Sequence, residues 1–81
     1  MEYNTENTVH TFEKAFNSQP AWLQKMLRAK IIYRCGWESR TTFYNKLNGT
    51  TPIKPPEKAV IALLFAEHGI DSWSGDELIL N

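Results

Sequence analysis

Apolar residues recur along the chain every three or four positions, which is the spacing of one buried face of an α-helix. The first such stretch covers residues 6–17 and stops at an Asn-Ser-Gln-Pro sequence. The second covers residues 20–35, with leucine and isoleucine side chains four residues apart in one row. We predict a helix in each stretch. Ser18 is suited to cap the second helix, because its hydroxyl can accept a hydrogen bond from a free backbone amide.

A shorter third stretch begins after Gly36, whose freedom to adopt a left-handed backbone suits the end of a helix. Ser39 is expected to cap the third helix, which runs to Leu47 or Asn48. Within it, Phe43 and Leu47 lie four residues apart and therefore share one face. We expect that face to point into the core.

The segment after the third helix contains three prolines and cannot be helical inside, because proline lacks an amide donor and restricts the residue before it. Ile53 is expected to pin this loop to the core. A fourth helix should begin at Pro55 or Pro56, with Glu57 favourably placed in its first turn, and should close at Gly69.

These patterns predict an all-α fold, a compact bundle of four or five short helices with a central helix-turn-helix. The chain has 81 residues, which is enough for one domain only. We assign residues 1–5 to a flexible N-terminus, 6–70 to the helix-turn-helix domain and 71–81 to a C-terminal tail. The tail is expected either to fold back over its own core or to form a homodimer. The residues available for either role are Trp73, Leu78, Ile79 and Leu80.

The charges are distributed unevenly, although the net charge is zero. Residues 25–58 carry eight lysines and arginines against two glutamates, a net of plus six. Residues 1–24 sum to minus two and residues 59–81 to minus four. This asymmetry predicts a basic face between two acidic ends.

Little in the sequence favours catalysis or a cofactor. His10 and His68 stand far apart without a motif around them, and Cys35 is the sole cysteine, so neither a disulfide nor a zinc site is expected. The N-terminus is polar and acidic, unlike a signal peptide. No apolar run approaches the ~20 residues that cross a bilayer. We therefore expect a cytoplasmic protein that is not an enzyme.

The third helix carries the chemistry that suits nucleic acid. If Phe43 points inward, the polar residues around it point outward or lie at the flanks, where side chains can reach base edges in a major groove. Arginine can bond guanine with two hydrogen bonds and asparagine can do the same with adenine. The expected base contacts are Arg40 first, then Asn45, Thr41, Thr42 and Tyr44.

Several of these residues also have a structural interpretation. Tyr44 is equally suited to covering a small core, and Thr42 to completing the helix cap. Asn48 precedes a glycine and is typical of a helix end. Lys46 flanks the buried side and is also consistent with a solvated surface lysine.

The segment from Gly36 to Gly49 resembles the helix-turn-helix of phage-repressor-like and LacI-like regulators. The second helix of that motif often reads threonine, a small apolar residue, two polar residues, and an ending of apolar-leucine-asparagine-glycine, as in Thr42-Phe43-Tyr44-Asn45-Lys46-Leu47-Asn48-Gly49. Residues 20–70 look like small Bacteroidetes proteins described as helix-turn-helix-like. The resemblance implies double-stranded DNA as the partner. It also implies phosphate contacts from Ser39, Lys46, Lys54, Lys58, Arg28 and Arg34.

The chain departs from the common motif in two ways. Glu38 is one residue more than the usual turn contains, and Ile32 stands where alanine normally permits close helix packing. Trp37 in this turn can fill the gap between the two helices and fix their crossing angle. The prediction is therefore a sequence-preferring DNA-binding protein and transcriptional regulator. The alternative, favoured by the neutral total charge and by exposed aromatic residues, is a protein-interaction module on the same scaffold.

Overall fold

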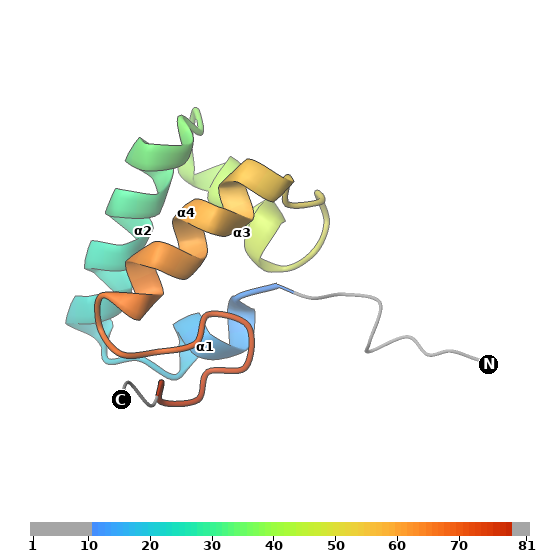
Figure 1. Cartoon of the computed structure of the whole chain (residues 1–81). Helices are drawn as coiled ribbons and strands as arrows, with labels where there is room; N and C mark the ends of the chain where they lie inside the picture. Colours follow the sequence, from blue (N-terminus) through green and yellow to red (C-terminus); the bar gives the residue numbers. More distant parts are fainter. Residues whose placement is uncertain (1–10, 79–81) are drawn as a thin grey trace.

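The computed structural model describes residues 11–78 (Figure 1). Within these residues it contains four helices, α1 (Glu13–Asn17), α2 (Ala21–Cys35), α3 (Arg40–Leu47) and α4 (Pro55–Ala66). No strand is formed there beyond one isolated bridge between Ile70 and Glu77. The predicted all-α fold is confirmed. None of the described helices is both long and apolar enough to cross a membrane.

The core is built around a cluster of phenylalanines. The ring of Phe12 lies 5.6 Å from that of Phe43 and 6.1 Å from that of Phe65, centroid to centroid, in edge-to-face contacts. Such contacts add a favourable electrostatic term to the burial of the rings. The apolar rows of α2 and α4 complete the core, and these two helices pack against each other (Figure 1). The buried residues of the rows are Leu23, Leu27, Ile31, Ile61, Leu64 and Phe65.

The first helix is shorter than the sequence predicted. In the described part of the chain it begins only at Glu13, whose amide donates to the hydroxyl of Thr11 at 3.2 Å. Phe12 is already buried and enters the core before the helix starts. The predicted cap at Ser18 is wrong, because Pro20 occupies the position before α2 and the Ser18 hydroxyl donates to a carbonyl of α1.

The other helix ends agree with the sequence, except that α4 ends at Ala66, three residues before the predicted Gly69. Gly36 ends α2 with φ of 71°. Ser39 precedes α3 and its hydroxyl accepts from the amide of Thr42 at 3.5 Å. Pro55 begins α4, and the buried Ile53 fixes the loop before it. The polypeptide leaves α4 at Ala66 and turns through a glycine at 69 with positive φ.

The tail folds back across the ends of α1 and α4 in its described part (Figure 1). The amide of Leu78 donates to the carbonyl of Gly69 at 2.8 Å, and Trp73 packs against the core. Gly75 lies so close to α1 that an added methyl group would be 3.3 Å from the Cα of Ala15. This is the arrangement expected of a tail that covers its own core. Ile79 and Leu80 lie outside the described residues.

Candidate nucleic-acid interface

Helix α3 buries one face and exposes the other, in the rotation that the sequence predicted. Phe43 is fully buried and Leu47 is 5% exposed. Beside this buried face, the exposed residues Arg40, Thr41 and Tyr44 follow one edge of the helix. Side chains on this edge are therefore open to solvent and able to contact a ligand.

The carboxylate of Glu57 holds α3 in place. It accepts hydrogen bonds from the indole of Trp37 at 2.8 Å, the ammonium of Lys46 at 2.9 Å and the amide of Lys54 at 3.0 Å. These donors come from the turn before α3, from α3 itself and from the residue before α4. We call this set, Glu57 with Trp37, Lys46 and Lys54, the Glu57 network. It joins the helix-turn-helix to the start of α4.

The network changes the acidity of two groups. Burial of Glu57 raises its pKa, but the hydrogen bonds from Trp37, Lys46 and Lys54 outweigh this effect, so the pKa lies below its ordinary value. Burial raises the pKa of the nearby Cys35 thiol to about 11, and the negative charge of Glu57 adds to the rise. Cys35 therefore stays protonated near neutral pH and is a poor nucleophile.

The prediction that Lys46 contacts phosphate is wrong. Its side chain is buried, and the ammonium donates to the carbonyl of Pro52 at 3.0 Å as well as to Glu57. It also lies 5.6 Å from the centre of the Trp37 ring. The physical reason is its position, three residues after Phe43, which turns the side chain toward α4 rather than toward water.

A contact that the sequence did not suggest joins α2 to α3. The guanidinium of Arg28 donates to the hydroxyl of Tyr44 at 3.1 Å. The Tyr44 ring meets Phe43 edge to face at 5.1 Å, and 40% of the residue remains exposed. Tyr44 thus covers the core and also lies at the surface. Through it, a cation of α2 is brought to the exposed edge of α3.

The remaining predicted site residues differ in accessibility. Thr42 and Asn45 are half-buried, and a carbonyl of α3 at Asn45 accepts from the amide of Thr51 at 3.0 Å. Ser39, Arg34, Lys54 and Lys58 are exposed. The last turn of α2, helix α3 and the start of α4 gather at one end of the molecule (Figure 1). The exposed cations of these segments therefore belong to the same end as α3.

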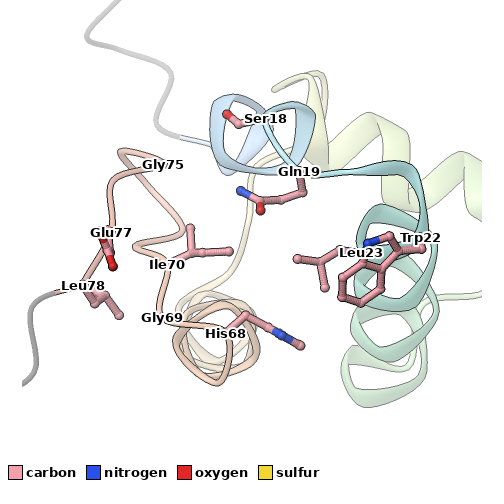
Figure 2. A pocket seen from close by; sticks show the side chains of 10 residues that line it. All are labelled: Ser18, Gln19, Trp22, Leu23, His68, Gly69, Ile70, Gly75, Glu77 and Leu78. Atoms are coloured by element: carbon pink, nitrogen blue, oxygen red, sulfur yellow. The ribbon is translucent and has the colours of Figure 1, made fainter.

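A groove of about 590 Å³ lies at the other end, between the start of α2, the end of α4 and the tail. Figure 2 shows Trp22 and Leu23 on one side of it, with His68 below and Ile70 opposite. Its titratable residues are His68 and Glu77. No group of three or more potential metal ligands occurs among residues 11–78. The groove is separate from the exposed edge of α3.

Comparisons with models of known protein families, with curated proteins and with solved structures give no match. The geometry and the charges of this chain are therefore the basis for its proposed function.

The two new features, the Glu57 network and the contact of Arg28 with Tyr44, had different signals in the sequence. A glutamate at the third position of a helix is typical of a capping arrangement, and Glu57 does accept from the amide of Lys54. Its bonds to Trp37 and Lys46 join residues far apart in sequence. No local pattern identifies such pairs.

Proposed function

We propose that the protein binds double-stranded DNA by inserting α3 into the major groove, as a regulator that prefers some sequences over others. The observation that carries this proposal is the exposed polar edge of α3, with Arg40, Thr41 and Tyr44 on a helix whose other face is anchored in the core. Eight helical residues extend about 12 Å, a length that fits the major groove.

The proposed roles follow from reach and charge. Arg40, at the start of α3, is the first candidate for a base contact, because a guanidinium matches the two acceptors of guanine. Thr41 and Tyr44 are the next candidates, whereas the half-buried Thr42 and Asn45 have less freedom to reach a base. The proposed phosphate contacts are Ser39, Arg28, Arg34, Lys54 and Lys58.

The surroundings of α3 also favour an anionic ligand. Lys46 and Glu57 neutralise each other beneath the helix at 2.9 Å, so neither charge projects from its outer edge. The carboxylate nearest to α3 in sequence is that of Glu38, which is exposed and lies one residue before the cap residue Ser39. The cations proposed for phosphate contact therefore dominate the electrostatic field around α3. Phosphate contacts of this kind provide affinity and base contacts provide preference.

The test is a titration of fluorescent duplex DNA with the protein, followed by anisotropy across a salt series. Four phosphate contacts would give a slope of about −4 in log K against log salt. Arg40→Ala is expected to reduce the preference between duplexes of different sequence. Lys54→Ala is expected to weaken binding to all of them alike and to reduce the slope by about one unit.

Lys14→Ala serves as the matched control, because it removes one exposed positive charge from α1, away from α3. It should leave both affinity and slope unchanged. No binding at low salt would reject the DNA proposal. Equal losses of affinity from Lys14→Ala and Lys54→Ala would mean that the interaction is nonspecific electrostatic attraction.

A protein-interaction module is the second candidate, favoured by one observation. Trp22 and Tyr33 on α2 are 64% and 84% exposed, which is unusual for large aromatic residues on the outer face of a helix. Neither is needed for DNA contact through α3. These residues lead to a separate inference.

A further inference from the structure

Helix α2 has two apolar rows. The inner row, Leu23, Leu27 and Ile31, is buried in the core. The outer row consists of Trp22, Met26, Ala29 and Tyr33, which follow the helical spacing on the other side. Trp22, Ala29 and Tyr33 are exposed and Met26 is half-buried. An exposed helix face normally carries polar residues, so an apolar row along its length indicates a binding surface.

The outer row is symmetric about its own centre. Trp22 and Tyr33 lie equally far on either side of the midpoint between positions 27 and 28, and so do Met26 and Ala29. A two-fold interface places the same patch of both copies together. If α2 packs antiparallel on α2 of a second copy, each Trp22 meets a Tyr33 and each Met26 meets an Ala29. Aromatic residues then meet at both ends, and a long side chain meets a short one between them.

We propose that this outer row is a self-association surface, on which α2 pairs antiparallel with α2 of a second copy of the chain. The proposal does not depend on DNA binding. A second copy is a better partner for the outer row than another protein, because the row is complementary to itself in the antiparallel direction. Between its aromatic ends the row extends about 16 Å.

The available area sets the strength of the pair. Given their exposed fractions, the four aromatic residues of two copies offer roughly 600 Å² in total. A stable complex normally buries at least ~1,200 Å². The pair should therefore be weak, with a dissociation constant on the order of 10–100 μM.

The flanking charges predict how salt acts on this pair. Lys25 and Lys30 are exposed on the two sides of the outer row. The two-fold axis places each lysine on the same side as its counterpart from the second copy, so like charges approach. Salt screens this repulsion and should strengthen self-association, whereas it should weaken binding to DNA.

Sedimentation velocity of the full chain without DNA, from about 5 μM to about 1 mM, measures the association. Trp22→Lys and Tyr33→Glu should each weaken it at least tenfold. Because residue 22 faces residue 33 of the other copy, an equimolar mixture of the two variants should associate more strongly than either alone. The double variant should likewise recover part of the loss, since each lysine then faces a glutamate.

Leu63→Glu is the matched control, because Leu63 is an apolar residue 55% exposed on α4 and outside the outer row. It should leave association unchanged. Circular dichroism of each variant establishes that the helices are retained. A chain that stays monomeric throughout would overturn the proposal and leave the row to another partner. Equal losses from Leu63→Glu and Tyr33→Glu would also overturn it, and so would a mixture no stronger than its components.

Discussion

Each end of the molecule is stabilised by a different kind of contact. At the helix-turn-helix end, α3 is fastened by the Glu57 network, in which one carboxylate accepts from two side chains and one backbone amide. At the other end, the amide of Leu78 in the tail donates to the carbonyl of Gly69, just after α4, and Gly75 packs closely on α1. Among the described residues, Arg34, Arg40, Lys54 and Lys58 are exposed at the first end, whereas Lys14 and Lys25 are exposed elsewhere. Most of the exposed carboxylates belong to α1, the end of α4 and the tail.

This difference explains how a chain with no net charge can present a cationic surface. Among residues 11–78, most of the exposed lysines and arginines lie in the last turn of α2, in α3 and at the start of α4, whereas most of the exposed carboxylates lie in α1, just after α4 and in the tail, toward the opposite end. Lys46 also lies in α3, but it adds no net charge to this surface because Glu57 balances its charge internally. The surface field around α3 therefore depends on position within the fold and not on overall composition.

The largest expected effect comes from the core that both ends share. Phe43→Ala should lower the free energy of unfolding by about 3–5 kcal/mol, because the fully buried ring contacts Phe12 and Phe16 and its removal leaves a cavity. Urea denaturation measures the change. Thr41→Ala on the exposed edge of the same helix should change stability by less than about 0.5 kcal/mol. Similar losses for both variants would contradict the observed rotation of α3.

A smaller effect is expected from breaking the Glu57 network. Glu57→Gln leaves the buried ammonium of Lys46 without a counter-charge and should cost about 2–3 kcal/mol. Glu77→Gln is the control at the other end, where the side chain is exposed, and should be nearly neutral. Urea denaturation of both variants makes the comparison. A neutral Glu57→Gln variant would mean that the network does not hold α3.

The tail end should respond to backbone changes. Gly75→Ala should cost about 1–2 kcal/mol, because the residue has φ of 83° and its new methyl group would press on α1. Gly69→Ala has a similar φ of 72° but open space around it, so its cost should be smaller. The difference in melting temperature between the two variants isolates the packing of the tail on α1. Equal melting temperatures would argue against that close contact.

The smallest expected effect is a loss of stability in acid, to which each end contributes one carboxylate. Hydrogen bonds lower the folded-state pKa of Glu57 despite its burial, and hydrogen bonds from Ser74 lower that of Asp71. A carboxylate with a lowered pKa stabilises the fold above its unfolded value, and this contribution is lost as the pH falls through the folded value. Stability should therefore decrease on acidification below about pH 4.5.

Denaturation at a series of pH values measures this loss. Glu57→Gln and Asp71→Asn should each flatten the decrease, because each removes one of the two carboxylates concerned. A decrease of unchanged steepness in both variants would assign the acid sensitivity to other groups.

Much of the fold could be predicted from local signals. Gly36, Ser39 and Pro55 set helix ends through backbone conformation, capping and ring geometry, which depend on neighbouring residues only. The predicted start of α1 is wrong. Phe12 continues the apolar spacing of the helix, but its ring reaches the core from a backbone position before the helix begins. Local periodicity does not distinguish these two cases.

The candidate site was predictable only in part. The rotation of α3 follows from the spacing of Phe43 and Leu47, so its exposed edge could be anticipated. The burial of Lys46 could not, since it depends on Glu57 and Pro52, which the proline-containing loop brings near. The pairing of Arg28 with Tyr44 depends in the same way on how α2 crosses α3. Sequence spacing identifies faces of helices, whereas these contacts require their arrangement in space.

The Glu57 network supports α3 from beneath, and this placement has a consequence for how the protein can vary. The side chains of Arg40 and Thr41 take no part in the Glu57 network, so exchanging them leaves that support of the helix in place. If α3 contacts DNA as proposed, chains with the same architecture could acquire new target preferences by replacing a few outward side chains. The supporting contacts and the exposed edge of α3 would then diverge at independent rates.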